Sequence, residues 1–432
     1  MSVRYSDDQS ALPKAHTSER SGGRRKPPPL RRSGNTKIIT MHSIVEVKDR
    51  KGWKLFHRVP HVVYRNDEKW ICPLESDVEA VFDPEKNKVL ENGEARCFVL
   101  LDGKKKPVGR IAAFIDHERN KKQPYSLGGI GFFDCINDQA LADILFETAE
   151  NWLKERGARA IDGPVNFGER EKFWGLLVKG FFPPLFQENY NPPYYEKFFL
   201  DWGFLPFEQI LTFRGDTSNI PFERLNKVMD TLCKRYDIKA DYLHLENLEQ
   251  YAQDFCEVYN AAFSQYEHFK PMTPDQPVEV INEAKAILDP KIITMAYFEG
   301  KPAGFCVSIP DINELLKPAK GKLNWRTIPG LLWRKWRAKK LNAKGIAFGV
   351  HPDYRSKGIA GILMAYSARE ENHSRYPEMY FTTVRAHNTE AVSVYMKLGV
   401  EIDRIHVAYR KPLADDIEIT PYKFVELPEQ MK

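Results

Sequence analysis

Apolar and polar positions alternate along the chain between strand-like and helix-like periods from residue 38 onward. Two stretches, 98–114 with a turn at Asp102-Gly103 and 292–309, predict β-hairpins because apolar runs flank short turns that contain glycine. Apolar side chains three and four positions apart predict amphipathic helices at 138–156, 359–366 and 391–398. Further strands are expected at 38–47, 160–163, 345–350, 379–384 and 402–409. This order predicts the α/β class, with an α+β mixed sheet.

The second half of the chain repeats the order of the first. Three short anchors align at shifts of 195, 197 and 196 residues: Pro107-Val108-Gly109 with Pro302-Ala303-Gly304, Asn191 with Asn388, and Trp202-Gly203-Phe204 with Leu398-Gly399-Val400. A nearly constant shift predicts an internal duplication, with one copy at 37–214 and the other at 215–432. The alternative, two unrelated α/β units that share common turn chemistry, stays open.

Charge is concentrated in two segments. The net charge is +5, yet residues 1–37 contribute +6 and residues 317–344 contribute ten basic residues and no acidic one, which leaves a body of −11. Residues 1–36 are rich in Ser, Arg, Lys, Pro and Gly and are predicted to be disordered, either as a solvated leader or as a weak contact for RNA or anionic lipid. An acidic body argues against a general nucleic-acid binder, since such proteins spread basic charge over a folded face.

The six cysteines are scattered and show no Cys-x-x-Cys or other metal-binding spacing. They favour a reducing compartment, so we expect a cytoplasmic protein without a metal. No apolar run approaches the roughly 18 residues that a membrane span needs, and the N-terminus does not have the pattern of a secretory signal.

The stretch Gly349–Ala360 has the most chemical content. A predicted strand runs into Arg355-Ser-Lys-Gly-Ile-Ala360 and then directly into a helix. A helix N-terminus presents free N–H groups to an anion, small residues let a pyrophosphate approach the backbone, and basic side chains add charge. The residues expected to bind the anion or to lie beside it are Gly349, Val350, Arg355, Ser356, Lys357, Gly358, Ile359 and Ala360. An ordinary helix start is the alternative.

With its lead-in His351-Pro352, this stretch resembles the cofactor signature of the GNAT acetyltransferase superfamily, Arg/Gln-x-x-Gly-x-Gly/Ala. The resemblance implies an acetyl-CoA or acyl-CoA donor and no metal. A second signature fits at Asn388 and Tyr395; in the superfamily this pair flanks the thiol end of the cofactor, and the Tyr commonly protonates the leaving thiolate. Tyr395 is therefore the candidate catalytic residue. A core role for Tyr395 and a helix-capping role for Asn388 stay open.

The first half lacks this signature. Its segment 132–138 offers Asp134 and Asp138 where the second half is expected to offer Arg355 and Lys357, and carboxylates would repel a pyrophosphate. We therefore expect two tandem GNAT-like domains of which the N-terminal one is degenerate. A bacterial group of tandem GNAT proteins, the YghO-like group, is similar to this chain at segments 161–168, 173–177, 189–195 and 310–313. This similarity does not identify the acceptor.

The resemblance implies an N-acyltransferase in which an amine attacks the thioester directly, with N–H groups near Gly349 and Val350 stabilising the oxyanion. The acceptor is expected to be a small-molecule or lipid-related amine. No general base stands out among four equal candidates, which are His351, His387, Asp311 and Glu299. Two other functions stay open: a catalytically silent acyl-CoA-binding protein, and a Fem-type aminoacyl-tRNA-dependent transferase.

The basic segment lies within an insertion at 313–344 of the second half. Its central part, 321–340, interleaves Trp325, Trp333 and Trp336 with Arg and Lys. Three interpretations stay open: a surface helix with a packed apolar side, a lid over the substrate, and a peripheral membrane contact.

Overall fold

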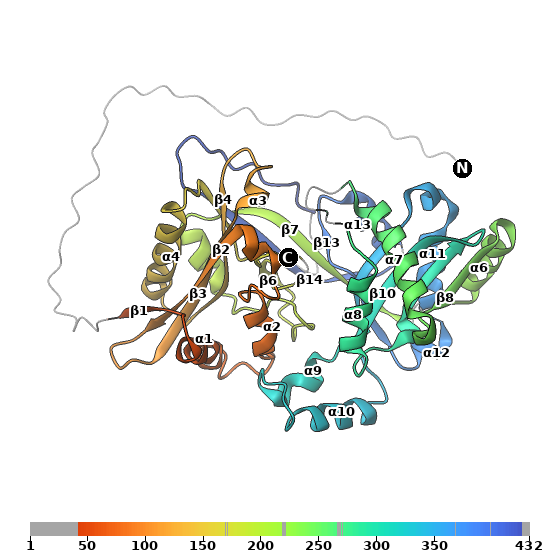
Figure 1. Ribbon diagram of the computed structural model, residues 1–432, viewed down its shortest axis with the longest axis horizontal. Coiled ribbons are helices and arrows are strands. Elements are labelled where there is room, and N and C mark those ends of the chain that lie inside the picture. Colours follow the sequence, from red (N-terminus) through yellow and green to blue (C-terminus); the bar gives the residue numbers. More distant parts are fainter. Residues whose placement is uncertain are drawn as a thin grey trace, which may run out of the picture. The chain divides into compact units, whose positions relative to one another are not determined.

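The stretches predicted to be strands join in one sheet, and helices cover its faces (Figure 1). The computed structural model describes residues 42–168, 170, 172–217, 222–265, 269, 271–367, 369–397 and 399–425. The predicted disordered tail at 1–36, the start of the predicted strand at 38–47, and Leu398 lie outside these residues. From residue 41 onward the chain forms one compact unit.

The first half contains two hairpin strands, a strand and helix that follow them, and a long final strand. Its elements are β1 (Ser43–Glu46), α1 (Arg50–Val63), α2 (Glu75–Ala80), a 3₁₀ helix (Lys88–Asn92), β2 (Gly93–Leu101), β3 (Pro107–Asp116), α3 (His117–Asn120), β4 (Leu127–Cys135), α4 (Gln139–Lys154), β5 (Ala160–Gly163), β6 (Leu176–Lys179), α5 (Tyr195–Asp201) and β7 (Leu205–Asp216).

The second half repeats this order after a connecting helix. Its elements are α6 (Phe222–Tyr236), β8 (Ile238–Tyr242), a 3₁₀ helix (Leu245–Asn247), α7 (Leu248–Phe263), α8 (Asp275–Ala284), a 3₁₀ helix (Pro290–Ile292), β9 (Ile293–Phe298), β10 (Lys301–Pro310), α9 (Asn313–Leu316), a 3₁₀ helix (Lys317–Ala319), α10 (Ile328–Arg337), β11 (Ala343–Val350), a 3₁₀ helix (Pro352–Lys357), α11 (Ile359–Ser367), α12 (Glu370–His373), β12 (Glu378–Tyr380), β13 (Val384–Arg385), α13 (Thr389–Lys397) and β14 (Glu401–Pro412).

Local sequence explains why these elements form where the pattern predicted them. The helix expected at 138–156 is α4, whose N-terminus is capped by Asp138 through a 3.0 Å hydrogen bond from the Ala140 N–H. Its apolar stripe, which includes Leu141, Leu145 and Ala149, is buried against the sheet. Both predicted hairpins are confirmed as β2–β3 and β9–β10.

The two halves exchange their last strands, which the sequence did not predict. The sheet order is β1-β2-β3-β4-β5-β14-β7-β12-β11-β10-β9-β8. The last strand of the second half, β14, pairs with β5, and the last strand of the first half, β7, pairs with β12. The central pair β14–β7 is antiparallel, and the main apolar core contains residues of both halves, such as Phe199 and Tyr395. The boundary at 214/215 stays a prediction and falls within β7.

The strand predicted at 379–384 is interrupted, and this interruption positions the candidate site. The parallel strands β11 and β12 pair only at Ala343–Met379 and Lys344–Tyr380. Beyond this point β11 bulges, because Ser308 faces Gly345 and Val307 faces Ala347, so that Ile346 has no partner on β10. We call the part of β11 beyond Lys344, with the diverging β12–β13 segment, the second-half fork.

Candidate active site

The last residue of β11 carries the backbone groups that face the second-half fork. Val350 lies opposite Gly304 on β10, and the next residue, His351, donates its N–H to the Ala303 carbonyl at 2.9 Å. This pattern defines a non-hydrogen-bonded antiparallel pair, in which the N–H and C=O of Val350 point away from β10. Within the described residues neither group has a hydrogen-bond partner. Val350 therefore offers one donor and one acceptor at the fork.

The predicted anion-binding residues follow directly, in the 3₁₀ helix Pro352–Lys357 and the start of α11. Arg355 and Ser356 are exposed, whereas Ile359 is fully buried in the core. Lys357 points elsewhere, since its Nζ lies 5.2 Å from the centroid of the Tyr236 ring. The loop thus brings Arg355, which has no ion-pair partner within the described part of the chain, and Ser356 to the N-terminus of α11.

The glycines of this stretch have structural reasons that the sequence did not reveal. Gly358 has a φ of +81°, and a Cβ there would lie 2.8 Å from Leu232 on α6. A Cβ at Gly349 would lie 2.7 Å from the ring of Phe305. Gly361, in the first turn of α11, has open space around its missing side chain. Only at Gly361 can a side chain be added without strain.

Tyr395 lies in the core beneath the fork. It is 5% exposed, its ring packs against Phe213 and Phe381, and its hydroxyl shares a 2.6 Å hydrogen bond with Thr382 Oγ1. Burial raises the pKa of the Tyr395 phenol to about 12, so the hydroxyl keeps its proton at neutral pH. Asn388 Oδ1 accepts a 3.2 Å hydrogen bond from the Ala391 N–H and so caps α13. The catalytic role of Tyr395 stays a prediction.

The four candidate bases have different surroundings. His351 accepts a hydrogen bond from the Asp353 N–H at 3.3 Å and caps the 3₁₀ turn, and Glu299 is exposed in the β9–β10 turn. His387 stacks on Tyr422, with 4.2 Å between ring centroids. Asp311 is buried, and burial raises the pKa of its carboxyl to about 6 although Lys344 favours the charged form. The general base stays unassigned among these four residues.

A cavity of about 340 Å³ lies between first-half segments and Phe269, a residue of the connection between α7 and α8. Arg170 lines this cavity. Its guanidinium lies over the Trp174 ring, 4.9 Å from the ring centroid, and one guanidinium nitrogen lies 4.0 Å from the Glu208 carboxylate. Glu208 in turn forms a 3.1 Å ion pair with Arg385 of β13. The ion-pair chain connects this cavity to the strand segment that diverges at the second-half fork.

The equivalent point of the first half is closed by two tyrosines. Cys135 ends β4 opposite Gly109, in the register that Val350 occupies opposite Gly304, and the Ile136 N–H donates to the Val108 carbonyl at 3.1 Å. The Tyr195 hydroxyl accepts from the Cys135 N–H at 2.7 Å, and the Tyr194 hydroxyl donates to the Cys135 carbonyl at 2.9 Å. Both backbone groups that are free at Val350 are thus occupied at Cys135.

The predicted reason for degeneracy in the first half was wrong. Asp134 does not stand in an anion-binding loop: it lies within β4, opposite Arg110, and forms a 2.6 Å buried ion pair with it. Asp138 caps α4. Only residues 136–138 connect β4 to α4, whereas residues 351–358 connect β11 to α11. The whole anion-binding loop is absent, so no surface carboxylate needs to repel a ligand.

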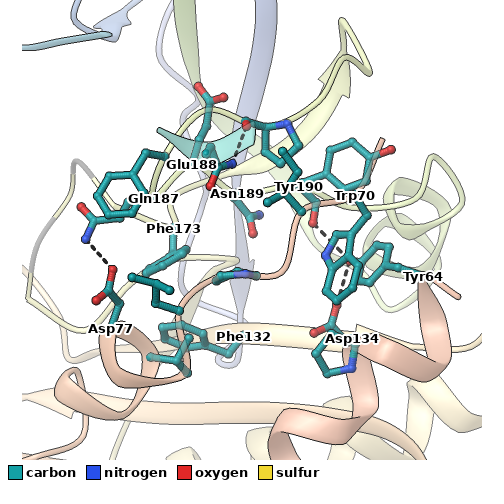
Figure 2. Close-up of a pocket in the computed structure, with 18 of the residues that line it drawn as sticks. Tyr64, Trp70, Asp77, Phe132, Asp134, Phe173, Gln187, Glu188, Asn189 and Tyr190 are labelled. Atoms are coloured by element: carbon teal, nitrogen blue, oxygen red, sulfur yellow. Dashed lines mark hydrogen bonds between the residues drawn. The ribbon is translucent and has the colours of Figure 1, made fainter. Parts of the chain in front are cut away.

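Figure 2 shows the small pocket that remains beside the end of β4, with a volume of about 50 Å³. Tyr64 donates to Asp134 at 2.8 Å and to the Tyr190 carbonyl at 3.1 Å, and Gln187 donates to Asp77 at 2.8 Å. These contacts draw the 184–190 loop over the end of β4 and leave room for a few atoms only.

Residues 252–400 match the model of the acetyltransferase (GNAT) family, and they include the second-half fork and the loop that follows it. By this match, the second half of the chain contains a domain of the GNAT family. The matched residues lie in the second half, where Val350 is free.

Two relatives and one solved structure extend this result to the tandem arrangement. A bacterial ceramide synthase of Caulobacter vibrioides is 28% identical over 307 residues, which cover 70% of this chain and 77% of that protein. Protein YghO of Escherichia coli is 26% identical over 331 residues, which cover 76% and 84%. A tandem GNAT protein from the clavulanic acid biosynthesis pathway shares the fold with a TM-score of 0.50 at 11% identity, over 87% of this chain and 100% of that one. The predicted mixed α/β fold of tandem GNAT type is confirmed.

Among the described residues, every helix is too short or too polar to span a bilayer.

Proposed function

We propose that this protein is an acyl-CoA-dependent N-acyltransferase whose second half binds the donor and whose acceptor is a lipid-related amine. The observation that carries the proposal is the free N–H and C=O of Val350 at the fork, directly before the loop and the N-terminus of α11. The match of the second half to the GNAT family supports acyl transfer, and the ceramide synthase relative supports an amine on a lipid.

The residues present fit a CoA thioester. Arg355 and Ser356 would meet the pyrophosphate, together with the free N–H groups at the start of α11. The Val350 C=O would hold the chain that leads to the thioester, as a strand edge holds an extended segment. Bound acyl-CoA supplies the carbonyl carbon that the amine attacks. The open space at Gly361 keeps this end of α11 accessible.

Two groups are proposed to assist the chemical step. The Val350 N–H would donate to the oxygen on which negative charge develops, an interaction that strengthens in the transition state. The Tyr395 phenol would supply its proton to the departing thiolate, and the proton that the attacking nitrogen loses would restore the phenol, whose hydroxyl is hydrogen-bonded to Thr382. The cavity beside Arg170 is proposed as the entry for the amine. The proposal places the reaction in the cytoplasm.

One observation favours a second candidate, an acyl-CoA-binding protein without turnover. Tyr395 is 5% exposed and already hydrogen-bonded, which is also what a purely structural tyrosine requires.

The test is an assay of thiol release from acetyl-CoA and from a long-chain acyl-CoA, with single-chain primary amines as acceptors and mass spectrometry of the product. The proposal expects an amide and an equimolar amount of CoA. Binding of acyl-CoA without any amide, across amines of short and long chain, would support the second candidate.

A further inference from the structure

The insertion of the second half presents a two-sided helix to solvent. Leu331 of α10 is 4% exposed and packs with Leu74, Ile312 and Leu316. Of the basic residues on this helix, Arg334 donates to the Leu315 carbonyl at 3.0 Å, and Lys335 donates to the Ala286 carbonyl at 2.8 Å. Leu331, Arg334 and Lys335 are three and four positions apart and thus share one face, which is the face bound to the protein.

The opposite face of α10 carries large apolar side chains in solvent. Trp336 is 81% exposed, Trp333 is 54% exposed and Leu332 is 40% exposed. Just before the helix, Trp325 is 76% exposed. Soluble proteins rarely leave several tryptophans uncovered on one short segment, because each exposed ring forfeits favourable burial. One of the three interpretations of segment 321–340 was a surface helix with a packed apolar side. It does not describe α10, because Trp333 and Trp336 lie in solvent.

Basic groups surround these rings. The guanidinium of Arg337 lies 4.9 Å from the centroid of Trp333, and that of Arg326 lies 4.8 Å from Trp325. Residues 317–344 contain ten basic and no acidic residues, within a body that is otherwise acidic. An occupant of this face must accept indole rings and carry negative charge.

A second copy of the chain fits this face poorly, because joining two such faces would bring the exposed basic side chains of both copies together. These are Arg326, Arg337, Lys339 and Lys340 of each copy. An anionic bilayer fits both requirements, since indole rings are stable at the boundary between headgroups and acyl chains, and phosphates pair with Arg and Lys. We infer that residues 323–340 dock this protein on the surface of an anionic membrane, with Trp325, Trp333 and Trp336 inserted among the headgroups.

This inference rests on the proposed function in one respect: the membrane would be the source of a lipid acceptor. Membrane binding itself can be measured without turnover, so the two proposals can fail separately. The experiment is co-sedimentation of the full chain with vesicles of phosphatidylcholine, with and without phosphatidylglycerol. The chain is expected to bind the anionic vesicles, and binding is expected to weaken as salt is raised. The double variant Trp333→Ala/Trp336→Ala should bind at least about tenfold less, because it loses apolar contact without any change in charge.

The matched control is Leu200→Ala/Leu205→Ala, which also removes two exposed apolar side chains, 44% and 46% exposed, from another surface. It should bind vesicles as the unmodified chain does. Both double variants should transfer acyl groups to a short, water-soluble amine at the unmodified rate, provided that the proposed function holds. Vesicle binding that survives loss of both tryptophans, or a tryptophan-dependent dimer in sedimentation velocity, overturns the inference. Loss of turnover on the short amine would instead support a lid.

Discussion

Cys135 and Val350 occupy the same position in two copies of one fold, yet only Val350 has its backbone free. Both end the strand that leads to the main helix, and both lie opposite a glycine, Gly109 or Gly304. At Cys135 the hydroxyls of Tyr194 and Tyr195 take the N–H and the C=O. Counted from the turns at Gly203 and Gly399, Tyr195 corresponds to Ala391, which has no hydroxyl to offer.

The comparison shows how one strand end of a duplicated fold is satisfied from within the chain. A buried N–H without a partner costs about 1–3 kcal/mol, so a first half without ligand must satisfy Cys135 internally. A tyrosine does so and fills the space at the same time. In the second half the same groups have no partner among the described residues, as the proposed donor site requires.

The largest expected effect is on turnover, in Val350→Pro. Proline removes the N–H that faces the fork but removes no hydrogen bond to β10, because Val350 is in a non-hydrogen-bonded pair. Loss of an oxyanion donor lowers kcat by about 10²–10³-fold in enzymes of known mechanism. Steady-state kinetics at saturating acyl-CoA would measure it. If Val350→Pro keeps both its unfolding midpoint and its kcat, the Val350 N–H takes no part in the chemical step.

The corresponding substitution in the first half is Tyr195→Phe, which should lower folding stability and leave turnover nearly unchanged. Phenylalanine keeps the ring in the core but leaves the buried Cys135 N–H unpartnered, at a cost of about 2 kcal/mol. Chemical denaturation would measure the loss, and kcat should stay within twofold. A large loss of turnover with intact stability would mean that the first half takes part in catalysis.

A smaller effect is expected for Tyr395→Phe, about tenfold in kcat, with the KM for acyl-CoA within a few-fold. The first half provides the precedent, since a shift of 196 places Phe199 at the position of Tyr395, and Phe199 is fully buried there without a hydroxyl. The ring alone therefore suffices for packing. Thr382→Val serves as the control, because it removes the partner of the hydroxyl but leaves the phenol. Equal rates in all three proteins would assign Tyr395 to the core.

The sequence was sufficient for local structure and for the family, but not for strand exchange. The hairpins, α4 and α11 follow from apolar periodicity and capping within each segment. Whether β7 pairs with its own copy or with the other depends on contacts between residues far apart in the chain. The patterns of β7 and β14 are compatible with both pairings, so no local signal distinguishes them.

The closure of the first half was missed for a different reason. In the sequence, segment 189–195 supports only a family resemblance, and Asp134 falls where Arg355 is expected in the other half, whereas in register it corresponds to Gly349. The duplication itself contained the missing signal, because the same shift that aligns the turns sets Tyr195 against Ala391. Only the structure shows that the Tyr195 hydroxyl reaches the Cys135 N–H at the end of β4.

The most direct test of the central claim, that the second half alone binds the donor, is titration calorimetry with acetyl-CoA. Gly361→Glu is a better probe than a substitution at Gly358, whose φ of +81° and contact with Leu232 would strain any side chain. A carboxylate at Gly361 has open space and suits a helix N-terminus, but it repels a pyrophosphate there. The account predicts one acetyl-CoA per chain for the unmodified protein and for Gly361→Ala, and no measurable binding for Gly361→Glu with an unchanged unfolding midpoint. Two acetyl-CoA molecules per chain, or unchanged affinity in Gly361→Glu, would contradict it.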